Sequence, residues 1–212
     1  MNYTRTMNNI EIQTPWQEYK WVEKLNDDTG ITRYYLKTIF RTEEAIDGEE
    51  KKFLDFLDRF DNKIVDYAYN NQLKWFKTKN DSVEDIQDQY ISSVYRMKDD
   101  EGVVDKTKNP SFRCKIPFYR SKDADNDEGS FKIEAYDHNE EKIDSESIAE
   151  EFAAGPRMCR LVIKLNPAYF NGSGFGVPMS VVKLQLDQSD FDLDDDACFE
   201  SSSDSETESD EE

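Results

Sequence analysis

Histidine and paired cysteines are scarce in this chain of 212 residues. It has one histidine, His138, and three cysteines far apart in the sequence, Cys114, Cys159 and Cys198, with no Cys-x-x-Cys pair. A structural zinc site needs about four such ligands, so we expect no metal site. An odd number of cysteines at these spacings is typical of a protein kept in a reducing compartment.

Long apolar runs are also missing. No segment approaches the roughly 20 apolar residues of a membrane-spanning helix. Residues 1–15 contain no apolar stretch of the signal-peptide kind. We therefore expect a soluble, intracellular protein that does not enter a membrane.

Signatures of catalysis are absent as well. The chain has no Gly-x-Ser-x-Gly elbow, no Walker A loop and no His-Glu-x-x-His motif. Acidic residues are so numerous that no carboxylate pair stands out. The sequence therefore predicts no catalytic residue, no cofactor and no enzyme activity.

Positive charge is missing from the end of the chain. Residues 187–212 hold thirteen of the 47 acidic residues and none of the 27 basic ones, which leaves the first 186 residues with 34 acidic and 27 basic side chains, a formal charge of −7. Such a segment cannot bury a core, so we predict a disordered acidic C-terminal tail.

The tail has two interpretations that the sequence leaves open. It can simply keep the protein soluble, or it can mimic nucleic acid and bind basic partners. Three apolar residues, Phe191, Leu193 and Phe199, interrupt the acid. Five hydroxyl residues have an acid three positions later and are predicted phosphorylation sites, each adding negative charge: Ser201, Ser203, Ser205, Thr207 and Ser209.

The clearest folded signal is a pair of alternating runs between Arg157 and Leu186, joined by a loop rich in glycine and aromatic residues. Alternation predicts half-buried strands, because successive side chains on a strand point to opposite faces. The predicted inward faces are Cys159, Leu161, Ile163 and Leu165 in the first run, and Ser180, Val182, Leu184 and Leu186 in the second.

Helical spacing appears in the middle of the chain. Apolar residues recur at steps of three and four between Glu49 and Phe76, and the predicted stripe is Phe53, Leu57, Phe60, Ile64 and Ala68. A second helix is predicted from Asp81 or Ser82 to Met97, and Ser82 and Asp85 have the spacing of a capping box.

Further alternating runs predict strands over Ile31 to Arg41, Phe112 to Arg120 and Phe131 to Tyr136. Residues 16–22 fit a strand or a short helix, and residues 147–152 a short helix. About five short strands avoid exposed edges most simply by closing into an antiparallel barrel. The predicted organisation is a flexible N-terminal arm (1–15), a barrel domain (16–186) with a helical insertion at about 49–97, and the acidic tail. The fold class is mainly β with two inserted amphipathic helices (α+β).

Basic and aromatic residues alternate on the outward faces of the predicted strands. Cations that follow phosphates and rings that stack on bases are suited to single-stranded nucleic acid. The wet side of any half-exposed strand explains the same pattern. The predicted nucleic-acid contacts are Arg33, Lys37, Arg113, Lys115, Tyr119, Arg160, Lys164 and Lys183, with Tyr169, Phe170 and Phe175 as rings of the loop.

Three segments carry a resemblance to a known family: Leu73–Tyr90, Pro110–Phe118 and Cys159–Leu186. They resemble, in the same order and before an acidic C-terminus, the single-stranded DNA-binding proteins of large nucleocytoplasmic DNA viruses, of the type related to the short-tailed phage replication protein. The chain departs from that pattern at Lys77, where the family's Trp-Phe-Gly-Lys-like segment has glycine. It also ends on Glu212 rather than on an aromatic residue.

The resemblance implies an OB-fold barrel that coats single-stranded DNA during viral replication and recombination, at replication sites in the host cytoplasm or nucleus. It also implies a tail that competes with DNA and contacts viral replication enzymes. Two alternatives remain at this point: a viral structural or scaffold protein whose tail binds basic partners, and an acidic chaperone for histone-like proteins. The sequence also leaves a homodimer open.

Overall fold

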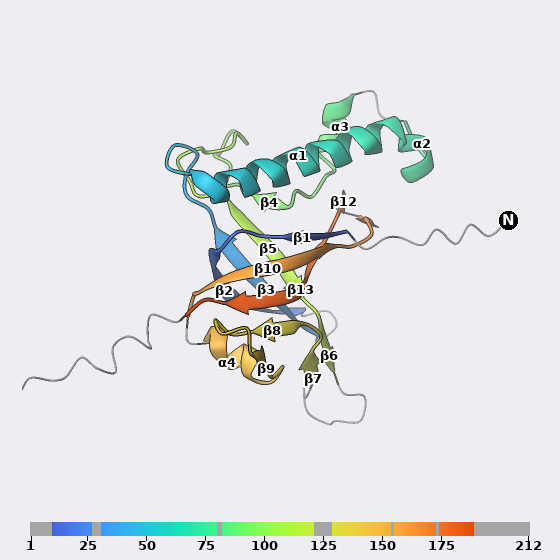
Figure 1. Cartoon of the computed structure of the whole chain (residues 1–212). Helices are drawn as coiled ribbons and strands as arrows, with labels where there is room; N and C mark the ends of the chain where they lie inside the picture. Colours follow the sequence, from blue (N-terminus) through green and yellow to red (C-terminus); the bar gives the residue numbers. More distant parts are fainter. Residues whose placement is uncertain are drawn as a thin grey trace, which may run out of the picture.

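The structure is a computed structural model that describes residues 10–26, 31–79, 82–120, 129–153, 155–172 and 174–188. Its centre is a β-barrel, with helical layers above and below it (Figure 1). The predicted acidic tail lies outside the described residues, apart from its first two.

Five strands close the barrel in the order β10 (Arg157–Leu165), β2 (Gln17–Asn26), β3 (Ile31–Ile39), β5 (Ser111–Ile116) and β13 (Met179–Leu186), and β13 pairs back with β10. The predicted five-stranded OB-like barrel is thus confirmed. One pairing differs from the antiparallel prediction, since β13 runs parallel to β5.

Short strands extend this barrel. β1 (Glu11–Gln13) pairs with β10, β4 (Val94–Tyr95) with β5, and β6 (Phe118–Arg120) with β7 (Gly129–Phe131). β8 (Glu134–Tyr136) pairs with β13 and with β9 (Lys142–Ile143). The hairpin of β11 (Tyr169–Asn171) and β12 (Gly174–Gly176) connects β10 with β13.

Two predictions for strands need correction. Residues 10–15 do not form a loose arm, because β1 pairs with β10 and the buried Thr14 exchanges hydrogen bonds with the backbone of Leu161. Residues 131–136 do not form one strand. Phe131 ends β7, and Glu134–Tyr136 is β8. The fifth barrel strand is instead β2, which takes in residues 17–22 of the undecided segment.

A β-bulge changes the inward face of β13. The register passes from Val162 opposite Lys183 to Ile163 opposite Val181, so Val182 is the additional residue. Before the bulge Met179 and Val181 are buried, and after it Leu184 and Leu186 are. The predicted inward positions Ser180 and Val182 are therefore wrong, whereas Leu184 and Leu186 are confirmed.

The helical layer lies above the barrel and consists of α1 (Gly48–Asn70), α2 (Gln72–Trp75) and α3 (Val83–Gln87) (Figure 1). The first helix is confirmed at about its predicted length, and the capping box of Ser82 and Asp85 is present. The second predicted helix is much shorter than expected. The following run, Tyr90 to Tyr95, is rich in aromatic and β-branched residues of low helix propensity, and β4 begins within it.

The core has two parts. The larger fills the barrel and continues upward to α1 through Phe53, Leu54 and Leu57, and downward to α4 (Ser147–Ala153) through Ile148 and Phe152. The smaller joins the last turns of α1 to α3 and the hairpin through Val65, Ala68, Ile86, Tyr90 and Phe175. Among the described residues, no helix is long and apolar enough to cross a membrane.

Candidate nucleic-acid interface

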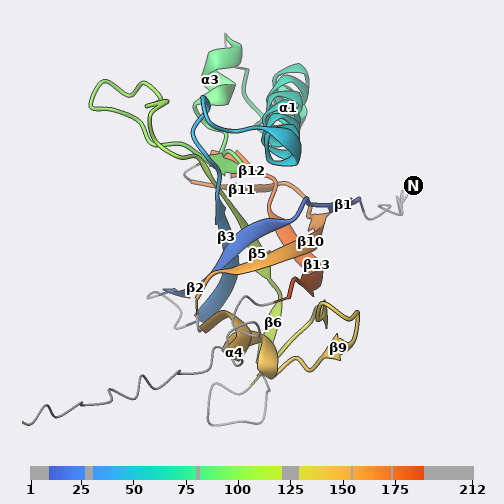
Figure 2. The ribbon, with the colours of Figure 1, turned by 60° about the vertical axis from the view of Figure 1, so that its left-hand side comes forward.

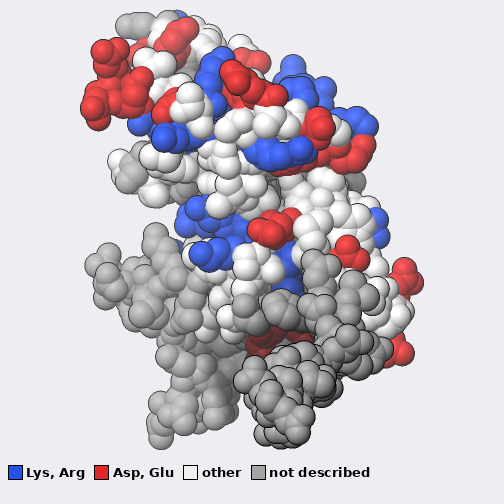
Figure 3. Space-filling model, turned by 90° about the vertical axis from the view of Figure 1, so that its left-hand side faces the viewer, with Lys and Arg blue, Asp and Glu red and all other residues white. Residues whose placement is uncertain are grey.

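A groove of about 1010 Å³ runs along the outside of β2, β3 and β5. It is closed on its other side by residues 91–95, by Tyr169 and Asn171, and by residues 177–179. Basic side chains gather on the barrel below the indentation that separates it from the helical layer (Figure 3). The cations that line the groove are Lys20, Arg33, Lys37, Arg113 and Lys115.

Strand register places three of these cations in one row. Lys20 lies opposite Lys37, and Lys37 lies opposite Arg113. Like charges directly opposite each other on neighbouring strands destabilise a sheet. The row therefore costs folding free energy unless an anion binds there.

No acid in the described part of the chain offsets this row. None of the described residues that line the groove is Asp or Glu. Within the described part of the chain, none of the five cations forms an ion pair, whereas Arg41, Arg96, Arg157 and Lys183 all do. The groove is thus a local positive surface on a body with an excess of acid.

Tyrosines supply flat apolar faces along the same groove. The Arg113 guanidinium lies 4.5 Å from the ring centroid of Tyr35, a cation–π contact that fixes both side chains. Tyr95 is 67% exposed, and Tyr169 lines the groove from the hairpin. Rings beside cations are the two elements that single-stranded nucleic acid needs.

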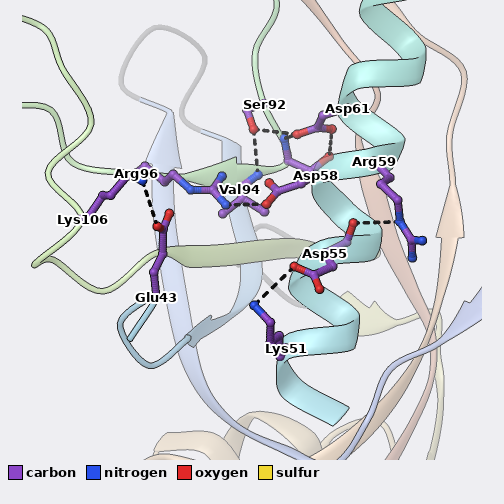
Figure 4. Close-up of polar contacts among 11 residues, drawn as sticks. Glu43, Lys51, Asp55, Asp58, Arg59, Asp61, Ser92, Val94, Arg96 and Lys106 are labelled. Atoms are coloured by element: carbon purple, nitrogen blue, oxygen red, sulfur yellow. Dashed lines mark hydrogen bonds and ion pairs between the residues drawn. The ribbon is translucent and has the colours of Figure 1, made fainter. Parts of the chain in front are cut away.

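The wall formed by residues 91–95 is held in place by a buried acid, Asp61 of α1. Its carboxylate accepts hydrogen bonds from Tyr90 Oη (2.6 Å), Ser92 Oγ (2.6 Å), Ser93 N (2.8 Å) and Ser93 Oγ (2.8 Å). Burial and this carboxylate raise the pKa of Tyr90, so the phenol remains a donor. One turn away, Arg96 pairs with Asp58 of α1 at 2.7 Å (Figure 4). The helix thereby positions one wall of the groove.

Replacing Asp61 by Ala should lower the free energy of unfolding by about 2 kcal/mol, because several donors lose a charged acceptor at once. Asp61→Asn should lose less. Its amide oxygen can accept from Ser92 and from the Ser93 N–H, while its NH2 group donates to the two hydroxyl oxygens on the other side. Urea unfolding of the three proteins measures the order, and equal stability of Asp61→Ala and wild type would contradict this role.

The structure brings five of the predicted contacts together in the groove: Arg33, Lys37, Arg113, Lys115 and Tyr169. The others lie outside it. They are Tyr119 on β6, Arg160 and Lys164 on β10, Phe170 and Phe175 on the hairpin, and Lys183 on β13.

Two of the outlying cations have partners of their own. Lys183 pairs with Glu134 at 2.7 Å, which raises the pKa of the ammonium and lowers that of the carboxyl. Arg160 lies 5.0 Å from the ring centroid of Trp16 and donates to Gln185. Both outward positions thus have structural contacts on another side of the barrel.

The two hairpin phenylalanines differ in accessibility. Phe175 is fully buried, so its ring is closed to any base, and the prediction that it stacks on nucleic acid is corrected by its place in the smaller core. Phe170 is 49% exposed and remains accessible.

Sequence reasoning missed several groove residues: Lys20, Ile39, Ile91, Ser92, Ser93 and Tyr95. Lys20 was missed because residues 16–22 were not assigned as a strand. Tyr95 was missed because it fell inside the predicted second helix. The exposed Ile39 and Ile91 add apolar surface to the groove. The predicted phosphorylation sites, from Ser201 to Ser209, lie outside the described residues.

Comparison with known proteins gives a fold and no family. No family model matches the chain, and no curated protein matches it. Among solved structures, it is similar to gp2.5, a single-stranded DNA-binding protein encoded by bacteriophage T7, with a TM-score of 0.50 and 11% identity over 95% of this chain and 100% of that one. It also matches the single-stranded DNA-binding protein of bacteriophage Enc34 in complex with ssDNA, with a TM-score of 0.43 and 10% identity over 88% of this chain and 94% of that one. At this identity the T7 likeness shows the fold alone.

Proposed function

We propose that this protein binds single-stranded DNA, without sequence preference, in the groove over β2, β3 and β5. The observation that carries the proposal is the row Lys20–Lys37–Arg113, which forms no ion pair with any described residue. Like charges side by side are unfavourable in the free protein and become favourable when phosphates neutralise them. The shared fold with the T7 protein supports this function.

Single strands suit the groove better than duplex does. Tyr35, Tyr95 and Tyr169 present ring faces among the cations, and a base can stack on a ring only if its own face is free. In a duplex, both faces of each base are covered by the bases stacked above and below it. Nothing in this contact depends on base identity, so binding is independent of sequence.

The biological setting of the proposal is viral DNA replication and recombination, inside the host cell at the sites of viral replication. The protein acts by coating DNA and not by catalysis. The acidic tail regulates the groove and recruits replication enzymes, which are its further partners. The support for the tail's role is its composition: thirteen acids and no basic residue follow a barrel that carries an unpaired positive groove.

Binding of one labelled oligonucleotide, single-stranded or annealed to its complement, tests the proposed function. We expect single-strand affinity to exceed duplex affinity, with log K falling by about 0.7 per neutralised phosphate for each tenfold rise in salt. Equal affinity for both forms, or no salt dependence, would overturn the proposal.

Removing residues 189–212 should tighten single-strand binding by about tenfold at low salt, because a tethered polyanion reaches millimolar effective concentration at the groove. The truncation begins after Gln188, since the Asp187 backbone N–H donates to Met158 O and belongs to the barrel. The gain should shrink as salt screens the tail. Phosphorylation at Ser201, Ser203, Ser205, Thr207 and Ser209 should weaken DNA binding.

The salt titration of full-length, truncated and phosphorylated protein decides the tail's role. A full-length protein that binds as tightly as the truncated one at low salt would leave the tail without influence on the groove. Its function would then be solubility or partner binding.

A further inference from the structure

A second basic and aromatic surface lies at the far end of the helical layer, outside the groove. We call it the α2 patch. It consists of Lys74, Lys77 and Lys79, which are exposed, and of the accessible apolar side chains Tyr67, Leu73, Trp75 and Phe170. The six residues 74–79 contain three lysines and no acid.

The aromatic rings of this patch form one cluster. Trp75 lies 5.4 Å from Tyr67 and 5.6 Å from Phe170, measured between ring centroids. Phe170 lies nearly parallel to the buried Phe175, at 5.9 Å and 14°. Phe170 therefore rests on the core through Phe175 and keeps about half of its surface in solvent, an arrangement suited to stacking on a further flat ring.

The backbone at Lys77 has an unusual conformation. Its φ is 63°, in the left-handed region that favours glycine and costs other residues about 1 kcal/mol or more. The side chain of Lys77 is exposed and, like those of Lys74 and Lys79, forms no ion pair with any described residue. No packing contact or ion pair in the described part of the chain accounts for a lysine at this position. Its charge is therefore available to a bound anion.

The α2 patch is continuous with the groove through strand β11. Tyr169 and Asn171 line the groove, and Phe170, between them, belongs to the patch, because successive side chains of a strand point to opposite faces. The hairpin is fixed against the layer by two backbone hydrogen bonds, Phe175 N to Gln89 O (2.9 Å) and Ile91 N to Phe175 O (2.7 Å). Figure 2 shows both strands of the hairpin directly below α1 and α3.

We propose that a DNA strand leaving the groove crosses the β11–β12 hairpin and continues over the α2 patch, where a base stacks on Phe170 and phosphates contact Lys77 and its two neighbouring lysines. This inference rests on the proposed function and extends it. The groove alone then holds short strands, and the patch adds affinity only for strands long enough to reach it.

Lys77→Gly is the sharpest test, since glycine suits the backbone conformation while it removes the charge. The Tm should stay nearly unchanged, because relief of the positive φ offsets the greater freedom of glycine in the unfolded chain. For an oligonucleotide of about 20 nucleotides, affinity should fall about threefold to tenfold at low salt and the salt slope by about 0.7. For one of about 6 nucleotides, both should stay at the wild-type values.

Phe170→Ala independently tests whether DNA contacts the same patch. It should reduce affinity for the long strand by about 5- to 100-fold and leave the short strand unaffected. Lys132→Ala is the matched control, because it removes one exposed cation next to β7, at the end of the molecule away from α2 (Figure 1). Apart from the small long-range effect of losing one positive charge, it should change the affinity for neither strand.

The outcomes separate the two proposals. Loss confined to the long strand supports the patch. Wild-type affinity of Lys77→Gly and Phe170→Ala for both strands, or an equal loss for both, would overturn it while leaving the groove proposal intact. Failure of the wild-type protein to bind either strand would overturn the proposed function itself.

Discussion

Replacing Lys37 and Lys115 together by Ala should weaken single-stranded DNA binding by roughly 100-fold at low salt, since a hydrogen bond to a charged group contributes about 1.5–3 kcal/mol when buried and less in an open groove. If each lysine contacts one phosphate, the slope of log K against log salt should fall by about 1.4. The free energy of unfolding should not fall. Lys37 lies between Lys20 and Arg113, so its removal relieves repulsion and should raise the free energy of unfolding slightly.

The matched control is the double variant Lys164→Ala with Lys183→Ala. It removes the same charge from β10 and β13, at positions that sequence reasoning also assigned to DNA but that do not line the groove. We expect its slope to equal that of the wild type, apart from the small long-range effect of net charge. An equal loss in both double variants would mean that DNA responds to overall charge and not to the groove.

The two double variants separate cations that the sequence alone could not tell apart. Alternation places Lys37, Lys115, Lys164 and Lys183 outside the barrel, and none of them is buried. Because the barrel is closed, its outward faces point in all directions, and only the strand order decides which cations share a side. That order depends on pairings between residues far apart in sequence, such as Lys20 with Lys37 across β2 and β3.

The fold was more predictable than the site because its signals are local. β10 alternates as expected, with Cys159, Leu161 and Ile163 buried. α1 buries Phe53, Leu57 and Ala68 of its predicted stripe, whereas Phe60 and Ile64 are only half-buried. The bulge at Val182 was hidden, because Val181 and Val182 are both apolar and either can point inward. The role of Asp61 was hidden as well. Its spacing of four from Leu57 and from Val65 puts a carboxylate on the buried stripe, but its four donors come from a segment that was predicted to be helical.

The side chain of Phe175 anchors the hairpin in the smaller core, against the helical layer. Its ring centroid lies 5.1 Å from that of Phe76, 5.3 Å from Tyr90 and 6.1 Å from Trp75, and the ring is fully buried. Gly174 permits this close docking, because a Cβ there would collide with the backbone oxygen of Gln89. The hairpin and the residue 91–95 wall of the groove thus depend on the same packing.

Replacing Phe175 by Ala should therefore lower the free energy of unfolding by about 3–5 kcal/mol, the usual result of truncating a buried phenylalanine. This is a large part of the stability of a single domain. Phe175→Leu, which retains much of the volume, should lose less than about 1.5 kcal/mol. Denaturant unfolding measures both. DNA affinity should follow stability in this pair, because Phe175 contacts no DNA and acts only by holding Tyr169 and residues 91–95 in place. If Phe175→Ala retained wild-type stability but lost DNA affinity, the ring would have to be a direct contact that opens to the strand.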